Sequence, residues 1–199
     1  MLIELHPEHP EPRKIRRAVE ALRKGEVIAY PTDTAYGLGV DLLSRPAIDR
    51  LYQVKGIPRT QQLAFLCHDL SDVARYTVVE QDAYRLLKRA LPGPYTFILK
   101  ATREVPKNLH SRRRTVGVRV PAHPVPIALV RELGHPILST TANRHGEPPV
   151  IDPREIELTF PGVSIVLDGG LGGEGLTTVI DLTENAVVRE GMGAIDGLF

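Results

Sequence analysis

Short apolar runs alternate with amphipathic stretches along the whole chain, and this alternation limits the choice of fold. Apolar runs bounded by Gly, Pro or polar residues are typical of buried strands, while apolar residues at three- and four-residue spacing indicate helices. We expect strands at 26–30, 63–67, 95–100, 115–120, 136–139, 163–167, 177–182 and 186–189, and helices at 11–24, 45–55, 70–76, 81–91, 125–133 and 153–159. Helices and strands interleave without a repeat or long linker, which predicts one α/β domain over residues 1–199, with a twisted mixed sheet.

Composition excludes several classes of protein. The 25 Lys and Arg residues balance 24 Asp and Glu residues, so attraction to a polyanion would have to come from local charge clusters. Cys67 is the only cysteine, which excludes an intrachain disulfide and a cysteine zinc cluster and favours the cytoplasm. No apolar run approaches the ~20 residues of a membrane span, and we expect no membrane partner.

The segment "YPTDTAYGLG" follows the expected strand at 26–30 and is predicted to be a loop. It carries the hydroxyls of Thr32 and Thr34 and the carboxylate of Asp33, and Gly37 and Gly39 permit a ligand to approach the backbone closely. In open α/β sheets, ligands bind where a strand passes into a loop. The alternative is a turn in which Thr and Asp form local hydrogen bonds only.

Three expected strand ends are rich in hydroxyl groups. They are Thr32–Thr34, Ser139–Asn143 ("STTAN") and Thr177–Thr178. Each could be explained by capping of its own turn, but a polar cavity lined from several strands explains all three together.

Basic residues lie between these segments. Arg119 falls inside an apolar strand, and a buried arginine needs an anionic partner, either a structural carboxylate or a ligand. Lys55 and Arg59 flank a Gly-Ile-Pro bend, whereas Arg112, Arg113 and Arg114 are consecutive in an expected loop. Either cluster could bind phosphates, and the alternative is that each is simply an exposed basic turn.

Common catalytic signatures are missing from the sequence. There is no phosphate-binding GxxxxGK[ST] loop, no GxGxxG after a strand, no HExxH and no GxSxG. No pair of histidines has the spacing of metal ligands, so no metal centre is predicted. Cys67 ends an expected buried strand and is interpreted as an inert core thiol.

The motifs together resemble the YrdC-like family of threonylcarbamoyl-AMP synthases. They are "KGEVIAYPTDTAYGLGVD", "LPGPYTFILK", "VGVRVPAHP", "STTAN", "TTVIDLT" and "VVREG", in the family's order, from about residue 12 to 191. The resemblance implies a twisted α/β sheet around a large, positively charged cavity. It also implies an enzyme that joins L-threonine, bicarbonate and ATP into threonylcarbamoyl-AMP with release of pyrophosphate, for threonylcarbamoyladenosine modification of tRNA.

The resemblance also assigns roles to individual residues. Threonine and bicarbonate would contact Thr34, Arg119, Ser139 and Thr177, and the nucleotide would contact Lys55, Arg59, Thr115, Thr141, Asn143 and Arg189. Lys55 and Arg59, with Mg²⁺, would neutralise the charge that develops on the phosphates and would be the catalytic pair.

One departure from the family pattern affects the catalytic pair. Where active synthases carry K-x-R-P, this chain reads Lys55-Gly56-Ile57-Pro58. Two alternatives stay open: the site lacks one guanidinium, or Arg59, two positions later, takes its place. Together with Thr141 in place of a serine, this change resembles the YciO branch of the family. It leaves three functions open: a synthase, a weakly active or non-catalytic paralogue that binds double-stranded RNA through Arg112, Arg113 and Arg114, or a different ATP- or carbamoyl-phosphate-using transferase with the same cavity. The sequence does not determine the oligomeric state.

Overall fold

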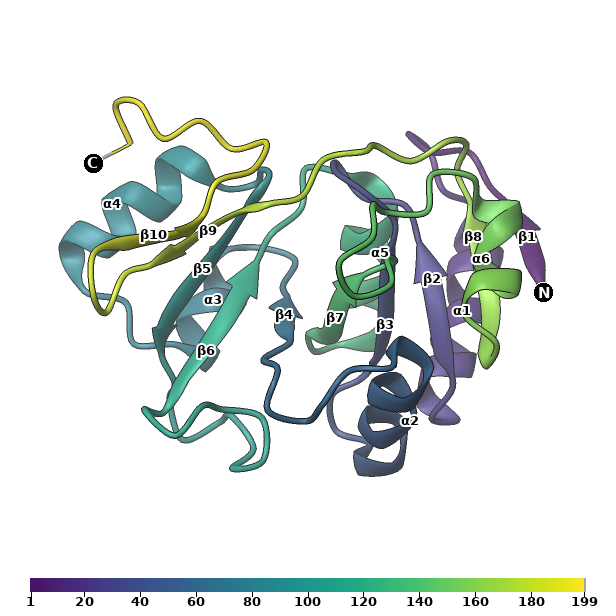
Figure 1. The fold of residues 1–199 in the computed structure, drawn as a ribbon, viewed down its shortest axis with the longest axis horizontal. Coiled ribbons are helices and arrows are strands. Elements are labelled where there is room, and N and C mark those ends of the chain that lie inside the picture. The colour runs from purple at the N-terminus through teal and green to yellow at the C-terminus, as the bar shows by residue number, and fades with distance from the viewer. Residues whose placement is uncertain (199) are drawn as a thin grey trace.

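The computed structural model describes residues 1–198 and contains one mixed sheet in the order β1-β8-β2-β3-β7-β4-β6-β5-β9-β10 (Figure 1). The strands are β1 (Leu2–Glu4), β2 (Val27–Tyr30), β3 (Gly37–Asp41), β4 (Ala64–Leu66), β5 (Tyr95–Lys100), β6 (Thr115–Arg119), β7 (Ile137–Thr141), β8 (Val163–Asp168), β9 (Thr178–Asp181) and β10 (Ala186–Arg189). The helices are α1 (Pro12–Arg23), α2 (Arg45–Lys55), α3 (Leu70–Tyr76), α4 (Gln81–Ala90), α5 (Pro124–Leu133) and α6 (Pro153–Thr159). The predicted α/β domain is confirmed.

Local sequence explains where the main helices begin and end. Pro12 occupies the first turn of α1, where a missing N–H costs nothing, and Ile15, Val19 and Leu22 form the buried face. Helix α5 begins at Pro124 after His123, whose Nδ1 accepts a hydrogen bond from the Val125 N–H. It ends at Gly134, which has φ +88°, a conformation that glycine adopts without strain.

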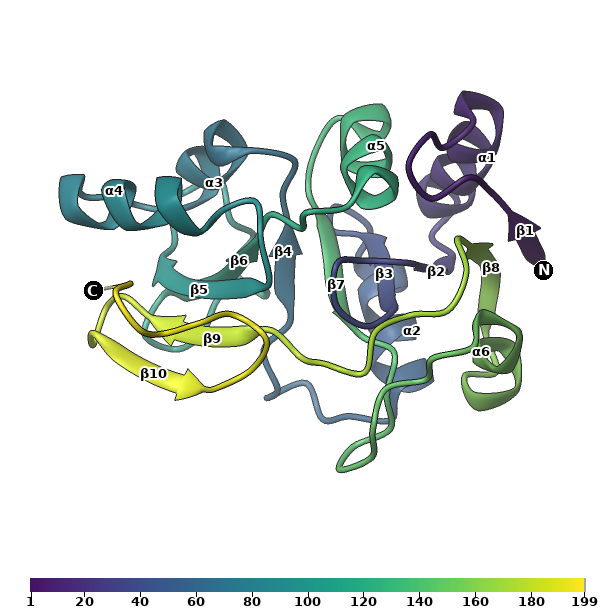
Figure 2. The same cartoon turned by 90° about the horizontal axis from the view of Figure 1, so that it is seen from above.

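Two hydrophobic clusters lie on opposite faces of the half of the sheet that contains β2. Ile28 and Tyr30 pack in the cluster that includes α1 and α5, while Val27 and Ala29 pack in the larger cluster that includes α2. This alternation follows from the period of two along a strand. Seen from above, α1 and α5 lie on one side of β2, β3 and β7, and α2 and α6 on the other (Figure 2).

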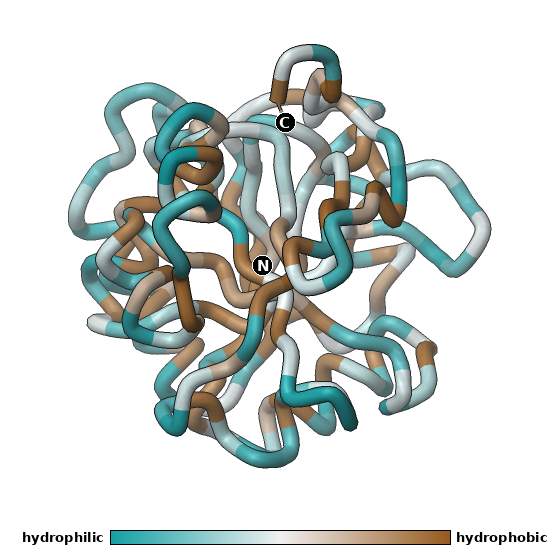
Figure 3. Tube along the Cα trace, turned by 90° about the vertical axis from the view of Figure 1, so that its left-hand side faces the viewer, coloured by the Kyte–Doolittle hydropathy of each residue, from teal (hydrophilic) through white to brown (hydrophobic). Residues whose placement is uncertain are grey.

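The sheet brings the middle of the chain and its C-terminal part together. β5 pairs with β6 on one side and with β9 on the other, so Thr178 lies beside Tyr95. Figure 1 shows β1 and the N-terminus at one end of the molecule and β9 and β10 at the other. Hydrophilic residues gather in the peripheral loops, and hydrophobic residues gather along the inner strands (Figure 3).

Three sequence predictions about strands were wrong. Residues 37–39, predicted as the end of a loop, belong to the fully buried strand β3, which runs between β2 and β7. Strand β1 was not predicted, and it pairs in parallel with β8. Strand β7 continues to Thr141 instead of ending at residue 139, so Ser139 and Thr140 lie within the sheet.

Candidate functional site

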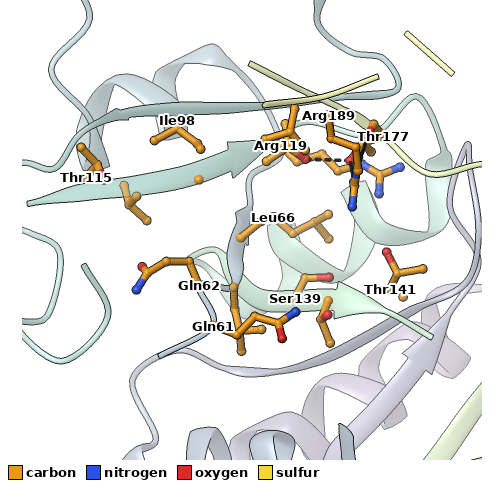
Figure 4. Close-up of a pocket in the computed structure, with 18 of the residues that line it drawn as sticks. Gln61, Gln62, Leu66, Ile98, Thr115, Arg119, Ser139, Thr141, Thr177 and Arg189 are labelled. Carbon is orange, nitrogen blue, oxygen red and sulfur yellow. Dashed lines mark hydrogen bonds between the residues drawn. The ribbon is translucent and has the colours of Figure 1, made fainter. Parts of the chain in front are cut away.

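A cavity of about 240 Å³ is the central feature of the candidate site (Figure 4). Its lining comes from β3 to β7, β9, β10 and the segment that leads into β4: Tyr36, Gly37, Gln61, Gln62, Leu63, Ala64, Leu66, Thr96, Ile98, Thr115, Val116, Gly117, Arg119, Ser139, Thr140, Thr141, Thr177, Val179 and Arg189. Six residues predicted from the sequence are therefore brought to one cavity: Thr115, Arg119, Ser139, Thr141, Thr177 and Arg189.

Arg119 ends β6, and its side chain is only 12% exposed. Its Nη2 atom lies 2.5 Å from Asp33 Oδ1 and 2.9 Å from Thr34 Oγ1. The sequence left a structural carboxylate and a ligand open as partners of this arginine, and the structure provides Asp33. Thr34, predicted to contact substrate, is thus held against Arg119.

Arg189 is the second cation of the cavity. Its Nε donates to the Thr177 carbonyl (3.1 Å), and its Nη2 donates to the Thr177 hydroxyl (3.0 Å). Burial, followed by the positive charge of Arg119, lowers the pKa of Arg189. Since Asp33 compensates Arg119, the charge of Arg189 remains available to attract an anion into the cavity.

Hydroxyl groups line much of the cavity. Ser139 Oγ lies 2.6 Å from the Tyr30 hydroxyl, and burial raises the pKa of Tyr30 to about 12. Thr96 Oγ1 lies 3.1 Å from Thr177 Oγ1, and Thr115 Oγ1 lies 2.7 Å from Ser111 Oγ. Hydroxyls both donate and accept hydrogen bonds, so this wall suits a ligand rich in oxygen atoms.

Lys55 lies at the end of α2 beneath the last residues of β7 rather than in the cavity wall. It is 4% exposed, and its Nζ donates to the Thr141 carbonyl (2.7 Å) and to Asn143 Oδ1 (2.6 Å), with a further contact to the Asn143 carbonyl. Burial, with a smaller effect of Arg144, lowers the pKa of Lys55 to about 8. Lys55 therefore fixes the "STTAN" segment, and neither it nor Asn143 is among the cavity-lining residues in the described part of the chain.

Arg59 and Ile57 lie apart from the cavity lining as well. Arg59 is exposed, forms an ion pair with Asp49 and lies over the Tyr52 ring. Ile57 is 8% exposed and belongs to the larger hydrophobic cluster. In this conformation Arg59 does not take the place of the family's arginine at the cavity.

The basic turn Arg112, Arg113 and Arg114 is exposed and directly precedes β6, whose first residue, Thr115, lines the cavity. Arg113 forms an ion pair with Glu184, and Arg114 has φ +57°. The turn therefore presents positive charge to solvent, with one of its three arginines already paired.

Sequence analysis missed several features of the site. Gln61 and Gln62 line the cavity from the segment before β4, and no motif singled them out. Asp33 was noticed as polar but was not assigned as the partner of Arg119. Tyr30 looked like an ordinary strand residue, and only the glycines opposite it, Gly37 and Gly39, could have signalled its ring: an added Cβ at either would lie 2.8 Å from that ring.

Other elements of the chain carry no sign of a metal centre. Cys67 is fully buried and its pKa is raised well above the usual value, chiefly by burial, an environment typical of a structural cysteine. Residues 1–198 contain no group of three or more His, Cys, Asp or Glu side chains placed to hold a metal ion. Within the same residues, no helix combines the length and apolarity that crossing a membrane requires.

Comparisons with known proteins identify the family. A model for Sua5, YciO and YrdC proteins, described as "Telomere recombination", matches residues 20–191. The uncharacterized protein YciO of Escherichia coli K12 is 43% identical over 196 residues, covering 96% of this chain and 95% of that protein. The crystal structure of E. coli YciO matches with a TM-score of 0.95 and 41% identity, over 100% of this chain and 99% of that chain.

Two further relatives carry informative names. Threonylcarbamoyl-AMP synthase of Chromobacterium violaceum is 37% identical over 185 residues, covering 92% of this chain and 96% of that protein. P. abyssi Sua5 complexed with L-threonine matches with a TM-score of 0.88 and 31% identity, over 96% of this chain and 57% of that one. The resemblance read from the sequence motifs is confirmed, and the chain belongs to the Sua5/YciO/YrdC family.

Proposed function

We propose that this protein is an L-threonylcarbamoyladenylate synthase, which condenses L-threonine, bicarbonate and ATP into threonylcarbamoyl-AMP and pyrophosphate. The observation that carries the proposal is the pair Arg119 and Arg189 among hydroxyl groups in one cavity. Relatives named threonylcarbamoyl-AMP synthase, and a Sua5 structure with L-threonine, support it.

In this proposal L-threonine and ATP occupy different parts of the cavity. The threonine carboxylate binds Arg119 near Thr34, because guanidinium geometry suits a carboxylate. The nucleotide lies along Thr115, Ser139 and Thr141 and reaches Arg189. Catalysis then depends on positioning and on charge stabilisation, since adenylate formation develops negative charge on the phosphates.

The proposal gives the metal a limited role. Mg²⁺ prefers carboxylate, phosphate and water oxygens, but the carboxylate of Asp33 is paired with Arg119, and the described residues form no metal-binding cluster. Mg²⁺ therefore enters only as the ion that ATP carries on its phosphates, and the product would serve threonylcarbamoyladenosine formation in tRNA.

A direct assay tests the proposal. The full chain is incubated with Mg-ATP, bicarbonate and radiolabelled L-threonine, and the products are separated by chromatography while pyrophosphate is measured in parallel. We expect a labelled nucleotide that requires all three substrates, and its loss in a folded Arg119→Ala variant. Binding of ATP and threonine without any labelled nucleotide would reject the synthase function.

A second candidate function is a weakly active or non-catalytic paralogue that binds double-stranded RNA. Two observations favour it: Lys55 is fully occupied by backbone and amide oxygens, and Arg59 pairs with Asp49. With Lys55 and Arg59 occupied in this way, fewer positive charges are available to the phosphates of ATP. Arg112 and Arg114 are exposed and would be the contacts to RNA.

A further inference from the structure

The ion pair between Arg119 and Asp33 is incomplete. Only Nη2 of Arg119 approaches the carboxylate, at 2.5 Å from Oδ1. Arg119 Nε and Asp33 Oδ2 are buried and have no hydrogen-bond partner in the described residues. A guanidinium and a carboxylate commonly pair through two parallel hydrogen bonds, so this arrangement leaves one charged donor and one charged acceptor unused.

Unused buried charged groups are unfavourable, and a native structure that contains them needs an explanation. A ligand that satisfies both atoms must offer an acceptor to Arg119 Nε and a donor to Asp33 Oδ2. A simple anion such as phosphate satisfies only the first and brings like charge beside the second. The head group of an α-amino acid satisfies both, because its carboxylate and ammonium lie on the same carbon atom.

The surrounding charges agree with a zwitterionic ligand. No Asp or Glu, Asp33 included, is among the described residues that line the cavity, and the negative charge that touches this lining is that of Asp33, through its contact with Arg119. The pair as a whole is neutral, as is an amino acid head group, while Arg189 remains for an anionic ligand. The side chains of Asp33 and Arg119 are 11% and 12% exposed, respectively, and Arg119 itself lines the cavity.

We propose that Asp33 is a specificity and positioning residue that accepts a hydrogen bond from the α-ammonium group of the amino acid whose carboxylate binds Arg119. The inference rests on the proposed function and deepens it, because it explains how the cavity selects a ligand with a free amino group. Arg119 alone would accept any small carboxylate.

Isothermal titration calorimetry with two ligands tests this role. L-threonine is compared with 3-hydroxybutanoate, which keeps the carboxylate and the hydroxyl but lacks the amino group. We expect the parent protein to prefer L-threonine. In Asp33→Asn the affinity for L-threonine falls roughly tenfold to a hundredfold, the effect of losing a charged hydrogen bond. The affinity for 3-hydroxybutanoate stays or rises, because Arg119 loses a competing carboxylate.

Glu184→Gln provides the matched control. It also converts a carboxylate that pairs with an arginine into an amide, but at the exposed Arg113. We expect both affinities to be unchanged in this variant. If Asp33→Asn does not fold, the preference of the parent for L-threonine over 3-hydroxybutanoate still tests the inference without any substitution.

Three results would overturn the role of Asp33. Equal losses for both ligands in Asp33→Asn would mean that Asp33 only holds Arg119 in place. Equal gains would mean that Asp33 competes with the ligand carboxylate. Equal affinity of the parent for both ligands would also reject the inference while leaving a carboxylate site intact. If the parent bound no L-threonine at all, the proposed function would fail, and the inference with it.

Discussion

At the residue scale, the packing of Ile57 limits which side chains position 57 can accept. It lies in the larger hydrophobic cluster directly after Gly56, which has φ +70° and ends α2. An arginine at this position would replace a buried apolar side chain by a charge, which is unfavourable within a hydrophobic cluster. We predict that Ile57→Arg lowers the free energy of unfolding by about 1.5–3 kcal/mol, the transfer free energy of a buried Ile side chain.

Urea unfolding of the parent and two variants checks this prediction. Ile57→Val is the conservative control and should cost about 0.5–1.5 kcal/mol. Unchanged stability of Ile57→Arg would show that the loop can rotate the new side chain into solvent or into the cavity. In that case the same variant becomes informative for adenylate formation.

Single residues also show the limit of sequence reasoning about the site. The residue types at Arg119, Ser139 and Thr177 predicted a polar cavity, because such side chains within or beside apolar strands need partners. The orientation of Lys55 could not be predicted, because it depends on where the end of α2 meets the end of β7. The sequence predicts α2 and β7 as separate elements, but it does not show that their ends lie against each other.

At the scale of the element, two glycines in the sheet have different reasons for lacking a side chain. A Cβ at Gly39 of β3 would lie 2.6 Å from Ile137 Cγ2 and 2.8 Å from the Tyr30 ring. A Cβ at Gly117 of β6 would meet its nearest neighbour, Thr96 Cγ2, at an ordinary 3.4 Å. Glycine at position 39 therefore allows Tyr30 and Ile137 to pack in the core. Glycine at position 117, which lines the cavity, leaves space there for a ligand.

We predict opposite effects for the two alanine variants. Gly39→Ala should destabilise the protein by about 1–3 kcal/mol through overpacking. Gly117→Ala should be neutral or stabilise it by up to about 1 kcal/mol, since glycine costs backbone entropy in a strand, while it weakens binding of a ligand in the cavity. Thermal unfolding and threonine titration of each variant measure both effects. Equal destabilisation by the two substitutions would contradict this distinction.

Strand β3 explains why the sequence-based boundaries failed at this place. Its residues Gly37–Asp41 contain two glycines, which weaken any strand pattern. In the sheet these glycines fit against the ring of Tyr30 on the neighbouring β2, a contact that no local pattern reveals. Strand β1 is only three residues long and depends on pairing with β8, far away in the chain.

At the scale of the whole molecule, charge balance decides how RNA binding must be tested. With 25 basic and 24 acidic residues, the protein has no general field that would attract a polyanion. Any RNA affinity would have to come from a local cluster. Two clusters of three exposed arginines can be compared: the turn Arg112, Arg113 and Arg114, and the α1 residues Arg13, Arg16 and Arg17.

Replacing either cluster by alanine lowers the net charge of +1 by the same three units, so the two triple variants are matched controls. If the turn contacts an RNA backbone, its variant should weaken binding of every duplex sequence alike and reduce the slope of log affinity against log salt by about two. The slope changes by nearly one for each phosphate that the protein no longer neutralises, and Arg113 is already paired with Glu184. The α1 variant should leave the slope unchanged.

The comparison is made by fluorescence anisotropy with two unrelated duplexes, at salt concentrations of roughly 50–200 mM, where non-specific binding weakens. If both variants reduced the slope equally, RNA binding would depend on the total charge of the protein and not on the turn. If the parent protein bound neither duplex, double-stranded RNA would be rejected as a partner.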